Sequence, residues 1–207
     1  MEDVLDLYEE PYDPAYPVVC FDESPYQLIS ETRKSLPAEP GQPARIDYEY
    51  RREGTCNLFL FFEPANGWRH VKVTERRTAS DWAQCMKELV DVHYPNATLI
   101  SVVQDNLNTH TPAALYAAFE PAEARRIVSK IDFRYTPKHG SWLNMAECEF
   151  SVLLRQCLDR RIATLEHVQA KADAWESARN TAKATVQWRF TSTKARAKLK
   201  RLYPSNL

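Results

Sequence analysis

Residues 98–106, TLISVVQDN, decide the fold class of this 207-residue chain. Their apolar, β-branched character is typical of a strand buried on both faces, and such strands lie in sheets covered by helices on both sides. The flanking segments fit this arrangement. Residues 78–94 have the pattern of an amphipathic helix with a cap at Thr78 or Ser80, and residues 112–130 are also helical. The stretch therefore indicates a crossover-linked strand of an α/β sheet.

Upstream of this strand, the sequence predicts an antiparallel meander. PVVCFDES (17–24) predicts a buried strand of about five residues. RIDYEYRREGTCNLFLFFEP (45–64) predicts a strand, a turn at Gly54 and a second strand. GWRHVKVTER (67–76) alternates between apolar and polar residues and follows a turn signal at Asn66-Gly67, so it predicts a further strand.

Downstream, IDFRYTP (131–137) predicts the last strand of the sheet, and Pro121 breaks the helix that precedes it. Residues 141–161 predict a helix, and more helix follows from Thr164. We therefore expect an α/β fold with a mixed five-stranded sheet, a three-strand antiparallel meander plus two crossover-linked strands, flanked by helices. The expected organisation is an acidic N-terminal segment (1–17), a core domain (18–163) and a basic C-terminal helical region packed on the core (164–207).

The composition excludes several classes of protein. Hydrophobic residues make up 44% of the chain, which is enough for a buried core. No apolar run approaches the ~20 residues that cross a bilayer, and five scattered cysteines without a CxxC pair indicate free thiols in a reducing, cytoplasmic compartment. With four glycines and no Walker or dinucleotide motif, a loop that cradles phosphates is not expected.

Charge is distributed unevenly along the chain, although the net charge is only -1. Residues 1–32 contain nine acidic residues and no Lys or Arg, whereas residues 177–207 contain eight basic residues and no acidic one. A basic end of this kind can follow a phosphate backbone, and a solvated helix face is the alternative interpretation.

Two aspartates follow apolar strands, and a glutamate lies on the helix predicted after the last strand. Asp22 and Asp105 each close a predicted strand, where ligands gather in α/β sheets. At 100° per residue, Glu147 falls on the core-facing stripe with Phe150, and Glu149 points the opposite way. A carboxylate on the core side is costly unless it is paired or binds a metal.

These three carboxylates suit Mg²⁺ or Mn²⁺, which prefer hard oxygen ligands. Two such ions about 3.5–4 Å apart would activate a water or a 3′-hydroxyl and stabilise a leaving oxygen. The alternatives are loop capping by the two aspartates and an arginine partner, such as Arg161, for Glu147. The phase also predicts that Glu147→Gln abolishes metal-dependent activity while Glu149→Gln has little effect.

Four sequence blocks resemble one known family, the mariner-like superfamily of DDE transposases in its bacterial insertion-sequence branch. QDNLNTH (104–110) followed by PKHGSWLNMAECEF (137–150) carries the most specific resemblance. VVCFDES (18–24) resembles the first acidic strand of that family, and VQWRFTSTKARAKLKRLYP (186–204) resembles its C-terminal ending. The resemblance therefore spans nearly the whole chain, and it implies a ribonuclease H-like fold.

By motif position, the resemblance implies that Asp22, Asp105 and Glu147 form a catalytic, metal-binding triad that takes two Mg²⁺ or Mn²⁺ ions. It also implies a set of residues that would shape the site or contact DNA, namely Asn106, His110, Lys138, His139, Ser141, Trp142, Asn144 and Arg189. For the two histidines a hydrogen-bonded loop position is the alternative. For the tryptophan a core position is the alternative to base stacking.

The chain departs from the family in two ways. There are 41 residues between Asp105 and Glu147, more than in many members, and we expect the extra residues in the helical region FEPAEARR (119–126). Nothing that resembles a helix-turn-helix precedes Asp22. The chain is therefore expected to be a catalytic domain whose DNA-recognition domain is missing or separately encoded.

The resemblance implies a DNA transposase domain that hydrolyses phosphodiesters and transfers strands at the ends of an insertion sequence. Its partners would be the element ends and target DNA, its location the bacterial cytoplasm at the nucleoid, and its assembly a homodimer that handles two DNA ends. Two alternatives stay open. One is a ribonuclease H-like nuclease that cuts without joining, and the other is an inactive or truncated remnant that only binds DNA or a partner.

Overall fold

A five-stranded mixed sheet forms the centre of the molecule in the computed structural model, which describes residues 1–33, 36–43, 45 and 47–203. The strands lie in the order β3-β2-β1-β4-β5. Their bounds are Val18–Glu31 (β1), Tyr50–Glu63 (β2), Trp68–Thr74 (β3), Ile100–Gln104 (β4) and Ile131–Tyr135 (β5). β1, β2 and β3 pair antiparallel, and β4 and β5 pair parallel to β1 and to each other. The predicted mixed sheet is confirmed.

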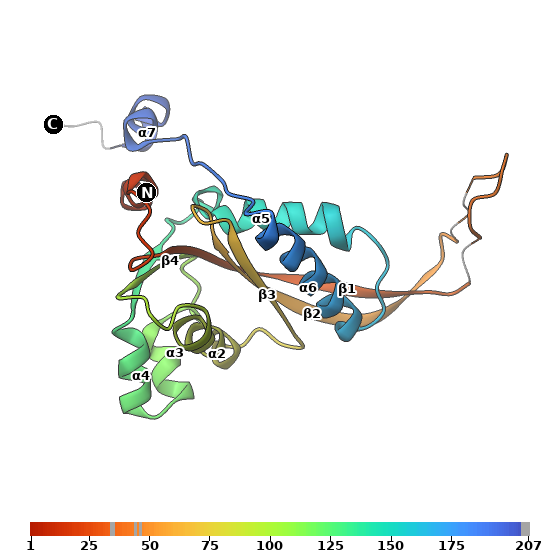
Figure 1. The fold of residues 1–207 in the computed structure, drawn as a ribbon, viewed down its shortest axis with the longest axis horizontal. Coiled ribbons are helices and arrows are strands. Elements are labelled where there is room, and N and C mark those ends of the chain that lie inside the picture. Colours follow the sequence, from red (N-terminus) through yellow and green to blue (C-terminus); the bar gives the residue numbers. More distant parts are fainter. Residues whose placement is uncertain (34–35, 44, 46, 204–207) are drawn as a thin grey trace.

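The first two strands are much longer than the sequence predicts (Figure 1). Each has 14 residues, and the pair extends as a hairpin well beyond the helices that cover the rest of the sheet. The predicted turn at Gly54 is wrong, because β2 continues through it. Gly54 has φ +109° and faces Leu28 where the register with β1 shifts, so it forms a bulge rather than a turn.

Helices cover both faces of the sheet, as the apolar character of β4 predicts. One face carries α2 (Ala79–Glu88), α3 (Pro112–Ala118) and α4 (Pro121–Val128), and the other carries α5 (Met145–Leu153) and α6 (Leu165–Thr181) (Figure 1). Strand alternation sends Cys20 to the α5 side and Phe21 to the α2 side, and each belongs to a separate buried cluster.

Two short helices lie together at the end of the molecule opposite the hairpin. α1 (Glu2–Glu9) belongs to the acidic N-terminal segment, and α7 (Ser192–Lys198) belongs to the basic C-terminal stretch. Arg196 of α7 forms an ion pair of 2.6 Å with Glu2, and Ser192 donates a 2.5 Å hydrogen bond to Asp6. The opposite charges at the two ends of the sequence therefore meet in space.

The helix α6 covers the exposed edge of the sheet as well as its face. Strand β3 is an edge strand, and its free backbone groups bond side chains of α6. Glu176 accepts a hydrogen bond from the Val71 N–H, Gln169 accepts one from the Val73 N–H, and Asn180 bonds both the N–H and the carbonyl of Arg69. An unpaired edge would invite pairing with another chain, and these side chains prevent it.

Several local signals in the sequence are confirmed. Thr78 caps α2 in a capping box with Asp81, and Pro121 begins α4 after the break behind α3. The predicted continuous helix over residues 141–161 is wrong in detail. A 3₁₀ turn at Ser141–Leu143 comes first, α5 begins at Met145, and the chain continues as a π-helical turn, Leu154–Leu158.

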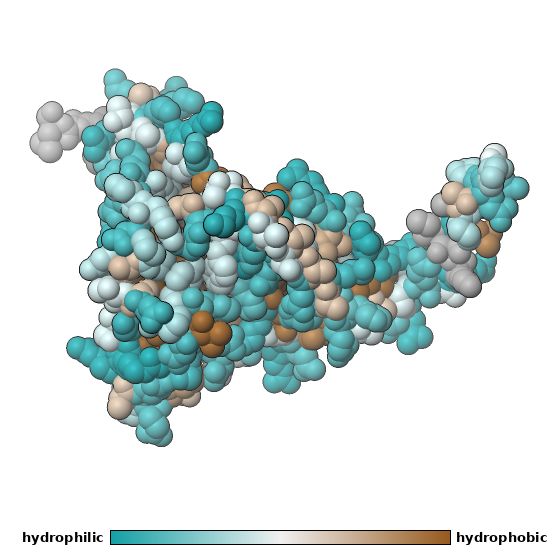
Figure 2. Space-filling model, in the orientation of Figure 1, coloured by the Kyte–Doolittle hydropathy of each residue, from teal (hydrophilic) through white to brown (hydrophobic). Residues whose placement is uncertain are grey.

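Hydrophilic residues cover most of the visible surface in Figure 2. Within the described part of the chain, no helix is long and apolar enough to cross a membrane. All five cysteines are free thiols, and only Cys148 is exposed.

Candidate active site

The structure places Asp22 and Asp105 at matching positions of neighbouring parallel strands. Cys20 of β1 pairs with Val103 of β4, and both aspartates follow two residues later. Adjacent strands lie about 4.8 Å apart, so the two backbones are close at this level. Asp22 does not close its strand as predicted, because β1 runs on to Glu31. It lies on the central strand, just past the point where the pairing of β1 with β4 stops.

The first turn of α5 is fixed to β1 next to Asp22. Asn144, the N-cap of α5, donates a 2.8 Å hydrogen bond to the carbonyl of Phe21 and accepts a bond of 3.1 Å from the Ala146 N–H. Tyr8 of α1 adds a second tie, since its hydroxyl donates to the Leu143 carbonyl at 2.8 Å. Glu147 lies within the first turn that these contacts hold.

The predicted orientation of the two glutamates on α5 is wrong. Glu147 is exposed to solvent, whereas Glu149 is buried with 2% of its surface exposed. The predicted phase assumes a straight α-helix from residue 141, but α5 begins at Met145 and passes into a π-helical turn after Leu153. The core-facing stripe therefore contains Glu149, and Glu147 is exposed to solvent.

Glu149 is held in a buried ion-pair network. Its carboxylate lies 2.8 Å from the Nε of Arg69 on β3 and 2.8 Å from the Nε of Arg179 on α6. Arg69 is fully buried and stacks over the rings of Phe62 and Trp175. This network joins α5 to the sheet and to α6. A signal for it existed in the sequence, because the alternation of β3 puts the cationic Arg69 on the inward face, where it needs a partner.

Asp22 lies in an environment that disfavours its charge. Burial raises the pKa of Asp22 to about 7, although a hydrogen bond from the Glu23 N–H opposes the rise. The negative charges of Asp105, Glu23 and Glu147 contribute smaller parts of this rise in pKa. All three predicted acids are therefore close enough to influence one another through space.

His110 is buried between Asp105 and Glu23, which agrees with the alternative of a hydrogen-bonded loop histidine. Its Nδ1 lies 2.6 Å from Asp105 Oδ1, and its Nε2 lies 2.8 Å from Glu23 Oε2. Burial alone lowers the pKa of His110, but the two carboxylates raise it to about 9, so the ring is an imidazolium at neutral pH. Glu23 was not among the predicted site residues, and nothing in the sequence marks it beyond its position after Asp22.

The remaining predicted residues lie on the loops and turns around these acids. Asn106, Lys138, His139, Ser141 and Arg189 are exposed, and Trp142 is 42% exposed. His139 adopts a left-handed conformation with φ 63°, which turns the chain toward α5. Trp142 is thus not the core residue that the alternative interpretation allowed.

The donor set fits a hard divalent cation in its chemistry. In the described part of the chain, no three His, Cys, Asp or Glu side chains are arranged as they stand to hold a metal ion. Asp22, Asp105 and Glu147 nevertheless offer only carboxylate oxygens, the ligands that Mg²⁺ and Mn²⁺ prefer. Burial, with a smaller contribution from the charges of the neighbouring acids, raises the pKa of Asp22, and a bound cation would favour its charged form.

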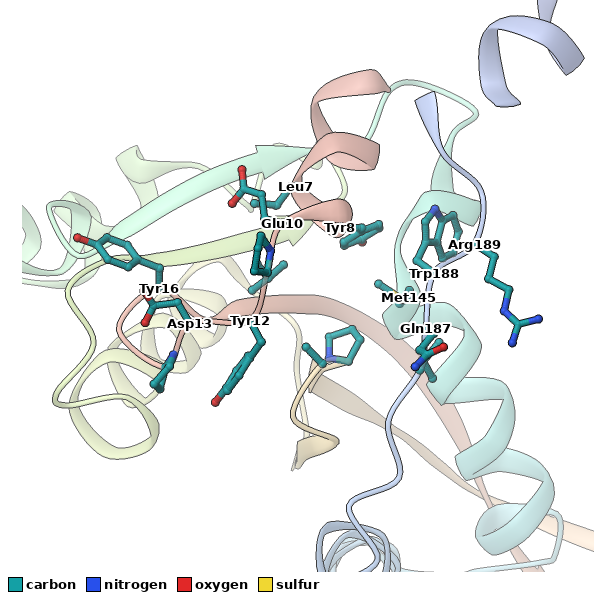
Figure 3. Close-up of a pocket in the computed structure, with 16 residues that line it drawn as sticks. Leu7, Tyr8, Glu10, Tyr12, Asp13, Tyr16, Met145, Gln187, Trp188 and Arg189 are labelled. Carbon is teal, nitrogen blue, oxygen red and sulfur yellow. The ribbon is translucent and has the colours of Figure 1, made fainter. Parts of the chain in front are cut away.

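A groove lies beside the start of α5 (Figure 3). Its volume is about 1150 Å³, and it runs between residues 7–18 and the C-terminal segment 186–189, with Met145 in its lining. Tyr8 and Trp188 both line this groove, and their rings are in contact, with ring centroids 5.4 Å apart. Arg189 extends outward from the same segment.

Residues 17–169 match the family described as DDE superfamily endonuclease. The chain belongs to this family. The match includes Asp22, Asp105 and Glu147, and it extends into α6. Among curated proteins, none matches the sequence.

Solved structures similar to this DDE endonuclease include complexes of the Mos1 mariner transposase. The Mos1 paired-end complex with Mn has a TM-score of 0.58 at 18% identity, covering 88% of this chain and 54% of that chain. The Mos1 strand transfer complex has a TM-score of 0.60 at 17% identity, with the same coverage of 88% and 54%. The likeness confirms the predicted ribonuclease H-like fold, and the chain spans about half the length of the Mos1 chains.

Proposed function

We propose that this chain is the catalytic domain of a DNA transposase that cuts phosphodiester bonds and joins the freed 3′-hydroxyl to target DNA. The observation that carries the proposal is that Asp22, Asp105 and the first turn of α5 lie together at the carboxyl end of β4. The family match and the fold shared with Mos1 strand transfer and paired-end complexes support it. We also propose a bacterial insertion sequence as the source, from the sequence blocks around Glu147.

Asp22, Asp105 and Glu147 would hold one or two Mg²⁺ or Mn²⁺ ions, which supply activation of a water or 3′-hydroxyl and charge stabilisation at the leaving oxygen. Mos1 complexes with Mn and with Mg are consistent with this choice of metal. The strand register puts Asp22 and Asp105 at matching positions of neighbouring strands, which supports this assignment. Glu147 is exposed, on the side of α5 opposite the buried Glu149, and its charge acts on Asp22, which supports its inclusion.

The surrounding residues orient these ligands. His110 engages one oxygen of Asp105 at 2.6 Å and leaves the second oxygen free. Because its other nitrogen lies against Glu23, the imidazolium ring is fixed from both sides. Asn144 fixes the first turn of α5, which carries Glu147, to β1 by donating a hydrogen bond to the Phe21 carbonyl. A shift of about 1 Å in such a support is expected to cost a large part of the rate.

The test supplies the purified chain with a supercoiled plasmid, a labelled duplex that carries a free 3′-hydroxyl, and Mn²⁺. Joined products support a transposase, nicks without joined products support a nuclease without strand transfer, and neither product supports a remnant that only binds. Glu147→Gln is the control, since it must lose every product that the wild type makes. A product that persists in this variant would contradict the assignment of the site.

Two partners are part of the proposal. The first is DNA, since the similar Mos1 structures contain transposon ends. The second is another copy of the chain, since two element ends must be handled together. A DNA-recognition domain outside this chain would supply the sequence preference.

A further inference from the structure

Trp142 presents an aromatic ring to solvent next to the candidate active site. The residue is 42% exposed, although a tryptophan gains much by being covered. Behind it lies Trp188 of the C-terminal segment, with ring centroids 6.3 Å apart and planes inclined by 17°. Phe190 meets the ring of Trp142 edge-on at 5.6 Å. One face of Trp142 is thus supported by aromatic neighbours, and a substantial part of the side chain stays open.

Both Trp142 and the ring of Trp188 that supports it are held in place by the backbone around them. The turn that carries it is closed by hydrogen bonds from Leu143 N–H to the Gly140 carbonyl (3.0 Å) and from Asn144 N–H to the Ser141 carbonyl (2.7 Å). Gly140 is required in this turn, because a Cβ there would lie 2.6 Å from Pro137 Cγ. Trp188 donates its indole N–H to the Phe190 carbonyl at 2.7 Å, so the supporting ring is fixed as well. A rigid aromatic surface loses little entropy when a planar ligand stacks on it.

The aromatic surface lies close to the residues that would hold DNA at the candidate active site. Asn144, two residues after Trp142, anchors the turn to the carbonyl beside Asp22. Arg189 follows Trp188, is exposed, and extends away from the segment in Figure 3. In the described part of the chain it makes no ion pair, so its guanidinium is available for a phosphate. An aromatic face with an arginine beside it is the combination that proteins use to hold unpaired nucleotides.

We propose that Trp142, backed by Trp188, is a stacking platform for an unpaired nucleobase of the DNA at the cleavage site, with Arg189 on the adjacent phosphate. This inference rests on the proposed function and specifies how its substrate is held. In an intact duplex both faces of a base are already stacked. The platform therefore selects a base that is unpaired at a cut end or displaced from the helix.

Binding to two short duplexes tests the platform without any cleavage. One duplex has a blunt end, and the other has a two-nucleotide single-stranded 3′ end that carries 2-aminopurine; both are titrated at low salt with EDTA present. The wild type is expected to prefer the unpaired end and to quench the 2-aminopurine fluorescence. Trp142→Leu keeps an apolar side chain against Trp188 but removes the π-face, and it is expected to lose about tenfold of that preference. Trp142→Phe is expected to retain part of it.

Tyr116→Leu is the matched control, because Tyr116 is a comparably exposed aromatic residue (44%) on α3, on the opposite side of the sheet. It should behave as the wild type. A wild type that neither quenches 2-aminopurine nor prefers the unpaired end overturns the inference, whatever the variants do. A Trp142→Leu variant that melts like the wild type and keeps its preference overturns it as well. The strand-transfer assay is independent of this result, so a wild type that joins DNA but fails the binding test overturns the platform alone.

Discussion

At the scale of single residues, Asp22 is expected to lower the stability of the metal-free fold. Its pKa is about 7 in the folded chain and 3.8 when unfolded. The folded state therefore holds more protons than the unfolded state between these pH values, and stability falls as the pH rises through this range. Asp22→Asn removes this penalty, so at pH 8 it is expected to be more stable than the wild type by about 2–4 kcal/mol.

Thermal melts at pH 4 and pH 8, with and without Mn²⁺, measure this effect. The variant and the wild type should melt together at pH 4 and separate at pH 8. Adding Mn²⁺ should raise the melting temperature of the wild type and leave Asp22→Asn nearly unchanged, because a ligand of the cation has been removed. An Asp22→Asn variant that is less stable than the wild type at pH 8 without metal would show that this carboxylate is not under strain.

Substitutions of the two glutamates of α5 are expected to have different effects, one on cleavage and the other on stability. Glu147 is exposed, so Glu147→Gln should keep the wild-type melting temperature and lose cleavage. Glu149 is buried between two arginines, so Glu149→Gln leaves uncompensated cations and should cost about 3–5 kcal/mol of stability. This replaces the expectation from helix phase that Glu149→Gln is harmless. Urea unfolding and plasmid cleavage, run on both variants, separate the two; a destabilised Glu147→Gln would argue against its exposed position.

At the scale of elements, the attachment of α6 to the sheet edge is open to test. Asn180 accepts hydrogen bonds from the backbone N–H and the side chain of Arg69 and donates one to the Arg69 carbonyl. Asn180→Ala removes these partners of the Arg69 backbone, while the Arg69 side chain keeps its bonds to Gly67, Ala184 and Glu149, and it should cost about 2 kcal/mol. Ser177→Ala, an exposed position on the same helix, is the control. Unfolding midpoints that shift equally in both variants would mean that helix propensity, and not the edge contact, sets the effect.

The elements also show which features the sequence could predict. The apolar run of β4, the alternation of β3 and the cap at Thr78 are local signals, and each predicted its element correctly. The length of β1 beyond Asp22 was not predictable, because residues 24–31 are mixed in polarity and are stabilised by pairing with a distant strand. The phase of α5 failed for a related reason. Its start is set by Asn144 bonding to Phe21, a contact across more than a hundred residues.

At the scale of the whole molecule, strand ends and motif blocks predict the three acids together with His110 and Asn144, whereas the other contacts around them could not be predicted. Glu23, Tyr8 and Arg69 act through contacts that depend on the completed fold. Of these three, only Arg69 has a signal in the sequence, because the alternation of β3 puts its charge at an inward-facing position. The distribution of charge behaves similarly: the acidic and basic ends were evident, but their meeting at α1 and α7 follows from tertiary structure.

That meeting of charges affects how the molecule should bind DNA. Several basic residues are already paired within the chain: Arg196 with Glu2, Arg134 with Asp3 and Asp132, and Arg126 with Asp91 and Glu123. Arg189, Lys198 and Lys200 of the C-terminal stretch form no ion pair within the described part of the chain and are exposed, so they can contact phosphates. Phosphate contacts position a protein on DNA without reading its sequence.

We therefore expect this chain to bind DNA weakly, with little preference for an element end over a scrambled duplex. The affinity should fall steeply with salt, because each neutralised phosphate contributes about −0.9 to the slope of log affinity against log salt. Glu2→Gln frees Arg196 and should raise the affinity for both duplexes equally at low salt, whereas Arg189→Gln should lower both and flatten the slope by about one. Titrations of both duplexes at several salt concentrations measure these effects. A preference of about a thousandfold for the true end would contradict the prediction, because a difference of that size requires contacts to base edges within this domain.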